Sequence, residues 1–308
     1  MIIWGPVASG LSFSLIGLAS HYSSLILLLI FGGLGISAFH PEAAALTASI
    51  SGRKRTLTMA IFMLGGTTGI GLGPFLILLI IATLGLEWSL VASLPAFVTA
   101  WLLYKHAPQL GKESSVPASS ICSLKTSLNQ KAFSFGILMA IVVLRATVIG
   151  SLTTFLPIIQ NLRGFSLFVA GGSFSLFMVC GALGGLTGGY LADQLGRKKI
   201  IQASFVILIP VFVAFLYWKG STGFIILALL GFLLFLSEPP CIVLAQEMIP
   251  QRARTASSLV MGTAWGLAGF GVLGTGAMAD AMGFEWALRF LTLLPVGSLI
   301  LSIFLPRK

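Results

Sequence analysis

Charged side chains are scarce in this sequence. Asp, Glu, Lys and Arg make up 8% of the residues and hydrophobic residues 57%, whereas about a quarter of a soluble domain is charged. This shortage excludes a water-soluble fold. The three cysteines, Cys122, Cys180 and Cys241, are isolated, and the three histidines are scattered. Their spacing fits no metal or redox motif, so the sequence predicts neither a metal site nor enzyme chemistry.

Long apolar runs are what the sequence has instead. Runs of roughly 20 residues, the length that crosses a bilayer as a helix, recur along the whole chain. The 36 glycines suit close packing of helices in lipid. We therefore predict an all-α membrane protein of about ten transmembrane helices. Their expected ranges are 3–20, 24–48, 56–82, 86–105, 133–159, 165–191, 199–218, 222–247, 254–280 and 284–305.

The Lys and Arg residues divide unevenly between the loops on the two sides of these helices. Arg163 and Lys219 fall in loops on one side, and nearly all other loop cations fall on the opposite side. Because positively charged loops stay in the cytoplasm, the second side is predicted to be cytoplasmic. The net charge of +10 then reflects topology, so we expect no nucleic-acid partner. Clusters such as Arg53–Arg55 would meet lipid headgroups.

A polar, Ser-rich segment over 106–131 separates two groups of helices and cannot lie in hydrocarbon. We predict a partial N-terminal transmembrane half over 1–105, a cytoplasmic linker over 106–131 and a C-terminal transmembrane half over 132–308. The C-terminus is predicted to be cytoplasmic as well.

The two halves repeat each other, as is common in transporters. Pro41 in the first half and Pro239 in the second are 198 residues apart, and each is followed by a basic loop and a glycine-rich helix. By this offset, the first-half partner of a charged loop at 189–198 would precede Met1. We therefore expect the first two helices of the N-terminal half to be missing, through a misassigned start, a true truncation or a remnant gene.

That charged loop carries the clearest motif. It reads Gly189-x-x-x-Asp193-x-x-Gly196-Arg197-Lys198 and resembles the signature loop of the major facilitator superfamily of secondary transporters. Softer motifs resemble the fosmidomycin-resistance branch, a group of bacterial drug-efflux proteins. These motifs are Phe39–Glu42, Gly65–Pro74, Ala245–Glu247 with Pro250, and Phe304–Pro306. The resemblance covers essentially the whole chain and implies a major-facilitator-type helical bundle, with four helices in a truncated N-terminal half and six in the C-terminal half.

In this superfamily the signature loop latches one half against the other and loosens as the transporter changes state. The resemblance therefore implies a conformational latch made of Gly189, Asp193, Gly196, Arg197 and Lys198. The Asp193 carboxylate can pair with Arg197 or face the positive N-terminus of a neighbouring helix, and Gly196 permits a tight turn. The alternative is an ordinary charged turn.

Four ionisable residues fall within predicted spans, where charge is costly and usually functional. Glu42, beside the helix-bending Pro41, could carry a proton. His40 could share that site or be a hydrogen-bonded packing residue. Arg145 keeps its charge and needs a buried anion, which Glu42, Glu238 or an acidic group of the substrate could supply.

Glu238 precedes Pro239 and Pro240, a broken-helix pattern typical of transporter cavities. We take Glu42, His40, Arg145 and Glu238 as candidates for proton or substrate coupling, with structural pairing as the alternative for each. Glu247, closer to the cytoplasmic end, is expected to be structural.

Gly69-x-x-x-Gly73-Pro74 resembles the antiporter motif of drug/proton exchangers. In that motif the glycines allow tight helix packing and the proline bends the helix. Generic packing of small residues is the alternative.

We therefore expect a secondary active transporter that exports a small drug-like or anionic compound in exchange for protons, by alternating access. The alternatives are a truncated, non-transporting fragment or membrane interaction protein, and a proton-coupled uptake symporter. The expected partners are a small-molecule substrate, protons and the bilayer, with the proton gradient as energy source and no cofactor. The expected location is the bacterial inner membrane, as a multi-pass protein that is monomeric if the full-length chain is made.

Overall fold

The computed structural model describes residues 2–107, 132–218, 220 and 222–306, without the side chain of Gln251. Most of the described residues are helical, and no strand occurs among them. Helices are the expected outcome for long apolar segments, because a bilayer offers the backbone no hydrogen-bond partners and a helix pairs its own groups. The linker predicted over 106–131 lies, beyond Ala107, outside the described residues.

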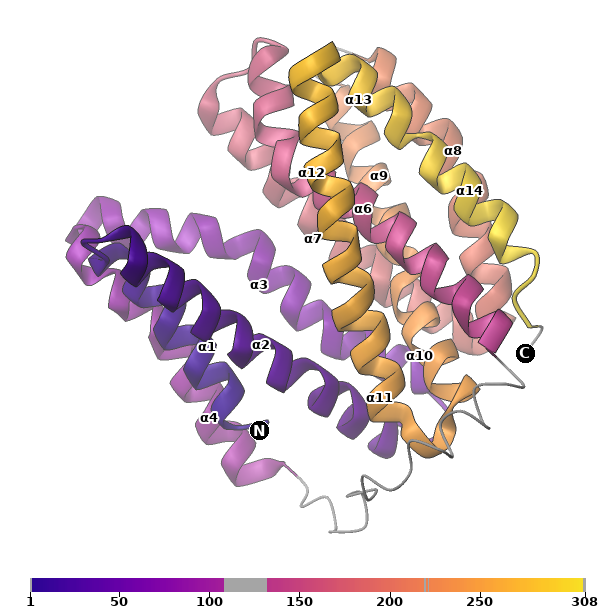
Figure 1. Cartoon of the computed structure of the whole chain (residues 1–308), viewed down its shortest axis with the longest axis horizontal. Coiled ribbons are helices and arrows are strands. Elements are labelled where there is room, and N and C mark those ends of the chain that lie inside the picture. The colour runs from indigo at the N-terminus through magenta and orange to yellow at the C-terminus, as the bar shows by residue number, and fades with distance from the viewer. Residues whose placement is uncertain (1, 108–131, 219, 221, 307–308) are drawn as a thin grey trace. The chain divides into compact units, whose positions relative to one another are not determined.

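Each of the predicted helical ranges contains a helix (Figure 1). Among the described residues, nine helical segments are long and apolar enough to cross a membrane, and Trp4–Leu18 is a shorter apolar one. The nine are Tyr22–Ile50, Arg55–Leu84, Leu86–His106, Ala132–Leu162, Leu167–Leu195, Arg197–Tyr217, Gly223–Met248, Ala253–Met282 and Phe284–Ser302.

The described residues form two compact units, one of residues 2–46 and 72–107 and the other of residues 47–71 and 132–306. Residues 47–71 pack with the second of these units. In the first unit, α1 packs against α4 and against the short helix η2, and Ser89 Oγ donates to the Ser14 carbonyl at 2.9 Å. The elements that contribute to this unit are α1 (Trp4–Ser14), η1 (Leu15–Leu18), α2 (Tyr22–Ile50), α3 (Arg55–Leu84), η2 (Leu86–Ser93) and α4 (Leu94–His106), α2 and α3 continuing into the second unit.

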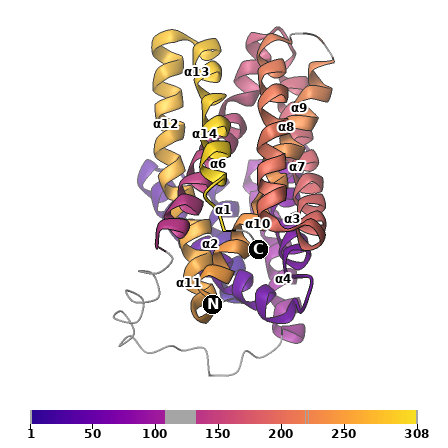
Figure 2. The same cartoon turned by 90° about the vertical axis from the view of Figure 1, so that its right-hand side faces the viewer.

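In the second unit, α9 packs against α7 and α8, and α12 and α14 pack against α6 (Figure 2). The core holds large apolar side chains such as Phe177, Phe205, Phe212 and Leu138. The elements are α6 (Ala132–Leu162), α7 (Leu167–Leu195), α8 (Arg197–Tyr217), α9 (Gly223–Leu236), α10 (Glu238–Met248), η5 (Pro250–Arg252), α11 (Ala253–Ser258), η6 (Leu259–Thr263), α12 (Ala264–Met282), α13 (Phe284–Leu291) and α14 (Leu293–Ser302).

The expected helix break falls at Ser237. It separates α9 from α10, and Pro239 and Pro240 stand in the first turn of α10, where their missing N–H groups would have no helical partner in any case. α10 contacts α6, α7 and α8, and all of its residues except Glu247 are buried. An ionisable group at the start of α10 is therefore enclosed by the second unit.

Glycine permits the closest helix contact of the second unit, between α7 and α9. A Cβ added at Gly184 would run into the Phe232 carbonyl, and one added at Gly188 into the Leu236 carbonyl. Small residues let helix backbones approach in this way, so that dispersion contacts and weak hydrogen bonds hold them together in lipid.

The substitution Gly188→Ala should lower the stability of the protein by about 1–3 kcal/mol, because the added methyl group meets a backbone carbonyl that cannot turn away. The measurement is the melting temperature of the detergent-solubilised chain. Gly172→Ala is the matched control on the same helix, since a Cβ there meets nothing within 4 Å. Equal melting temperatures for the two variants would contradict the packing account.

Candidate functional site

The Asp193 carboxylate caps the start of α3. Oδ1 accepts a hydrogen bond from the Thr56 backbone N–H at 3.1 Å and Oδ2 from the Leu57 N–H at 2.9 Å. α3 begins at Arg55, so these N–H groups belong to its first turn and have no partner within the helix. A carboxylate is favoured there both as an acceptor and by the helix dipole.

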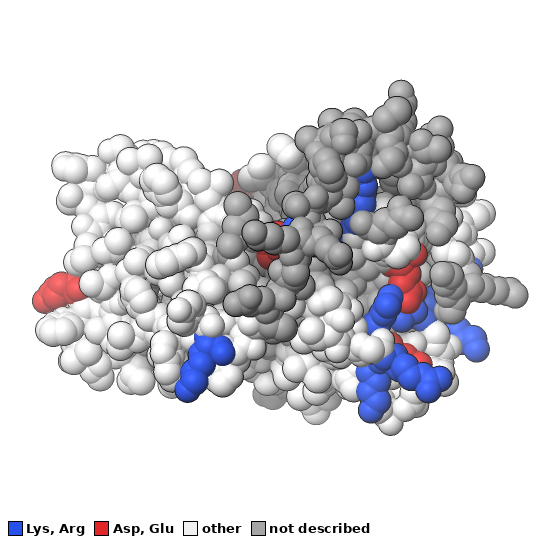
Figure 3. All heavy atoms as spheres, turned by 90° about the horizontal axis from the view of Figure 1, so that it is seen from below, with Lys and Arg blue, Asp and Glu red and all other residues white. Residues whose placement is uncertain are grey.

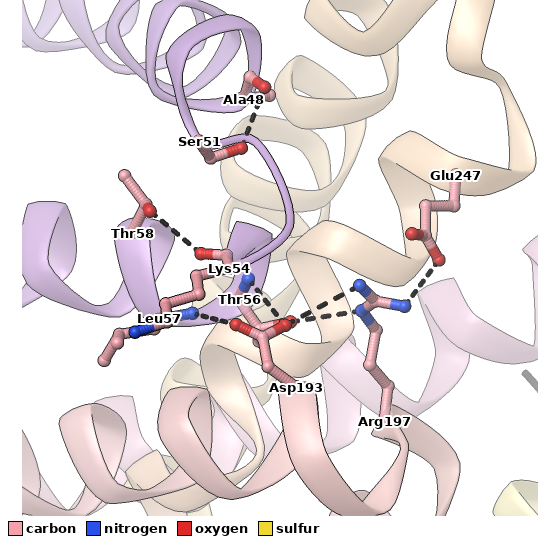
Figure 4. Close-up of polar contacts among 9 residues, drawn as sticks. All are labelled: Ala48, Ser51, Lys54, Thr56, Leu57, Thr58, Asp193, Arg197 and Glu247. Carbon is pink, nitrogen blue, oxygen red and sulfur yellow. Dashed lines mark hydrogen bonds and ion pairs between the residues drawn. The ribbon is translucent and has the colours of Figure 1, made fainter.

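Arg197 extends this contact into a network that joins α3, α7, α8 and α10 (Figure 4). Its Nη1 donates to Glu247 Oε2 at 2.8 Å, its Nε donates to Thr56 Oγ1 at 3.1 Å, and its Nη2 lies 3.8 Å from Asp193 Oδ1. The three ionised side chains are between 10% and 16% exposed. Charge-assisted bonds in such a sheltered place are stronger than those of exposed ion pairs.

The glycines of the loop give this network its geometry. A Cβ at Gly189 would lie 2.5 Å from the Ala60 Cβ and 2.7 Å from the Thr56 carbonyl, so only glycine lets α7 come this close to α3. Gly196 has φ +93° between α7 and α8, a conformation that residues with a Cβ rarely adopt. The turn makes Arg197 the first residue of α8, where its side chain faces Asp193.

Lys198 makes a different contact from the rest of the predicted latch. Its Nζ donates to the carbonyls of Ile303 and Leu305, each at 2.6 Å, and so caps the C-terminal end of α14 with a positive charge, as the helix dipole favours. Figure 3 shows Lys and Arg gathered mainly over one region together with acidic residues, and most of the other described surface in this view uncharged.

A second ionic contact lies within the spans of the second unit. Arg145 on α6 and Glu238 at the start of α10 have side chains that are 1% and 7% exposed, and Arg145 Nη2 lies 3.7 Å from Glu238 Oε1. Arg145 Nε, Arg145 Nη1 and the hydroxyl of Ser237 are buried without a hydrogen-bond partner among the described residues. The pair is therefore enclosed but incompletely satisfied, unlike the network around Arg197.

A cavity of about 300 Å³ is lined by residues near Arg145 in the sequence, but it does not include the Arg145–Glu238 pair. It is bordered by α6, α12, α13 and α14, with Leu144, Thr147, Thr275 and Phe290 among its lining residues. Its lining is predominantly apolar, and neither Arg145 nor Glu238 belongs to it. Within the part of the chain that the structure describes, no three His, Cys, Asp or Glu side chains are placed to hold a metal ion.

The model of the Major Facilitator Superfamily matches residues 1–272. The chain belongs to the major facilitator superfamily. As a member, it is a multi-pass membrane transporter of small molecules. This confirms the family that the signature loop predicted.

Two curated relatives match most of this superfamily member. The fosmidomycin resistance protein of Escherichia coli strain K12 is 29% identical to this chain over an alignment of 308 positions. The alignment covers 95% of this chain and 73% of that protein. The MFS-type transporter YfnC of Bacillus subtilis strain 168 is 28% identical to this chain over an alignment of 315 positions. The alignment covers 96% of this chain and 75% of YfnC.

Solved major facilitator structures share the fold. FucP in its outward conformation aligns with a TM-score of 0.76 at 17% identity, over 100% of this chain and 83% of FucP. The human organic anion transporter MFSD10 aligns with a TM-score of 0.76 at 15% identity, over 98% of this chain and 76% of that one. The predicted all-α helical bundle of this family is thereby confirmed.

The structure brings Arg145 and Glu238 together and places His40 and Glu42 in the first unit. Both of these lie half-buried on α2. His40 Nδ1 is 3.2 Å from the Ile36 carbonyl, and its ring packs edge-on against Phe39. Residues two apart on a helix point to different sides, so His40 and Glu42 do not form one site by virtue of their spacing.

The glycine motif of α3 makes its close contact at a position that was not predicted. A Cβ at Gly71 would lie 2.9 Å from the Met178 Cβ, and Ser175 Oγ donates to the Gly71 carbonyl at 3.0 Å. A Cβ at Gly69 or Gly73 would meet nothing within 4 Å among the described residues of its own unit. Pro74 lies inside α3.

Sequence reasoning expected Asp193 to pair with Arg197 or to face a helix N-terminus, but it did not identify that helix as α3. It also missed Glu247 as the partner of Arg197. The first turn of α3 could have been named, because the sequence already predicted a helix over 56–82, directly after the basic loop Arg53–Arg55. Glu247 could not, since its contact with Arg197 depends on how α8 packs against α10.

The substitution Asp193→Asn should lower the free energy of unfolding by about 1–3 kcal/mol, because an amide can accept only one of the two backbone bonds and carries no charge to face Arg197. Thermal unfolding in detergent measures this effect. Asp280→Asn, at an exposed position on α12, is the matched control. A loss of the same size in both variants would show that the Asp193 contacts contribute nothing specific.

Proposed function

We propose that this protein exports a small compound from a bacterial cell in exchange for protons, by alternating access. The observation that carries the proposal is the buried Arg145–Glu238 pair within the spans. Ionisable residues inside a membrane are costly and mark substrate, ion or proton pathways. In secondary transporters such groups stand near the midplane, at broken helices, as Glu238 does at the break between α9 and α10.

The direction of transport rests on a relative. The Escherichia coli protein that is 29% identical to this chain is named for resistance to fosmidomycin, and export is the simplest way in which a transporter gives resistance. Fosmidomycin is accordingly the first substrate to test.

Glu42 is the proposed proton carrier. It is a half-buried carboxyl on α2, next to Pro41 inside that helix. Desolvation in one conformation and contact with water in another would change its proton affinity and so link protonation to the conformational cycle. The proton gradient then supplies the energy, without a cofactor.

The network around Asp193 is proposed to be the conformational latch, with Gly189 and Gly196 setting its geometry. Its bonds to the first turn of α3 can be made and lost together, since two carboxylate oxygens and one guanidinium hold them. We place the protein in the inner membrane as a monomer. The loops that carry Arg53–Arg55 and Arg197–Lys199 face the cytoplasm, as the positive-inside rule requires.

The transport proposal is tested in everted membrane vesicles from cells that express the chain. Energised vesicles should accumulate fosmidomycin, and a protonophore should abolish the accumulation. Accumulation in right-side-out vesicles under an inward proton gradient would indicate an uptake symporter instead. No transport in either orientation, with the protein present and folded, would indicate a non-transporting membrane protein.

The substitution Glu42→Gln should abolish accumulation driven by a pH gradient, because the amide cannot carry a proton. Gradient-independent exchange of labelled for unlabelled substrate should persist. Glu87→Gln, at an exposed position in η2, is the control and should transport as the wild type does. Gradient-driven transport that survives Glu42→Gln would remove Glu42 from the coupling step.

A further inference from the structure

Arg145 is the least satisfied charged residue of the described buried core. A guanidinium has five N–H donors in a planar fork and no route to lose its charge. Only Nη2 approaches an acid, and its 3.7 Å separation from Glu238 Oε1 is longer than a hydrogen bond. Nε and Nη1 are buried and have no hydrogen-bond partner among the described residues.

Stability does not account for this arrangement. Desolvating two charges costs more than a single long ion pair returns, and a buried pair can often be replaced by apolar residues without loss of stability. Each buried donor without a partner adds a further cost. The packing around Arg145 therefore leaves guanidinium N–H groups unpaired, and a binding site for an anion requires such donors.

Other groups near Glu238 could also interact with an anion. The hydroxyl of Ser237, the residue before Glu238, is also buried without a partner, and it stands at the break between α9 and α10. Glu238 is the first residue of α10, and the positive end of a helix favours negative charge. Glu238 now supplies that charge.

We propose that Arg145 anchors an anionic group of the substrate, a carboxylate or a phosphonate, and that Glu238 is the internal counter-ion which this group displaces. When the substrate takes the place of the Glu238 carboxylate, Nη2 joins Nε and Nη1 in offering the full fork, which matches the paired oxygens of both groups. This inference rests on the proposed transport function only in taking the bound anion to be the substrate.

Two opposite effects follow for the two partners. Arg145→Gln removes the anchor, so affinity for an anion should fall by at least about tenfold. Glu238→Gln removes the internal competitor while keeping the shape of the side chain, so affinity for the same anion should rise. A pair with a purely structural role would give weaker binding, or none, in both variants.

The experiment measures equilibrium binding by calorimetry to the full chain in lipid nanodiscs, without a pH gradient. The probes are benzoate and phenylphosphonate as anions and benzamide as the uncharged match for benzoate. The wild type should bind at least one of the two anions more tightly than benzamide. Arg289→Gln, on α13 and exposed, controls for the loss of one positive charge and should leave binding unchanged.

Arg145→Gln leaves Glu238 buried without its partner, which can prevent folding. The double variant Arg145→Gln/Glu238→Gln removes both charges and serves as the second test. It should fold, as judged by a monodisperse elution peak and wild-type helical content, and should bind no anion. Benzamide binding as tight as the binding of both anions, anion binding retained in a folded double variant, or no anion binding to either the wild type or Glu238→Gln would overturn the proposal.

The binding result is separable from the transport proposal. Anion binding with the expected response of both variants, but no gradient-driven export, would sink the transport proposal and leave the anion site standing. Gradient-driven export that persists in the double variant would support the transport proposal and contradict the anion site.

Discussion

A bilayer offers no hydrogen-bond partners to a polypeptide backbone, and every feature of this protein follows from how that shortage is met. The long apolar segments meet it by forming helices, whose interiors satisfy their own N–H and C=O groups. The first turn of each helix remains unsatisfied. At α3 the protein solves this with a side chain from another helix, because Asp193 accepts bonds from Thr56 and Leu57. This cap ties α7 to α3 through a single side chain.

The same medium determines where charge is stable, and the protein keeps charge in two different ways. Near the end of α7, Arg197 contacts Asp193, Thr56 and Glu247 together, so the network is close to complete. Within the spans, Arg145 and Glu238 lie 3.7 Å apart, and two guanidinium nitrogens are left over. A complete network holds a structure, whereas an incomplete one has capacity for a ligand. This contrast, rather than burial alone, separates the proposed latch from the proposed substrate anchor.

Helix packing depends on which glycines face a neighbour, and the spacing of glycines does not reveal this. Gly184 and Gly188 bring α7 against backbone carbonyls of α9, and Gly189 brings α7 against α3. On α3 the contact with α7 falls on Gly71, whereas Gly69 and Gly73 carry the recognisable pattern. A glycine pattern indicates that two helices can approach closely. Which helices meet, and at which residue, depends on the rotation of each helix about its axis.

The sequence by itself determined the helices, their order and the family. The length of the apolar runs and the scarcity of charge leave a bilayer-spanning helix as the only low-energy state for each segment, and the charged loop at 189–198 is a local pattern readable without coordinates. Tertiary structure alone decided the partners: that Asp193 caps α3, that Lys198 caps α14 instead of joining Arg197, and that Arg145 faces Glu238. These contacts join residues from 93 to 137 positions apart. Helix periodicity fixes which side chains share a face over a few turns, but the packing of one helix against another sets which faces meet.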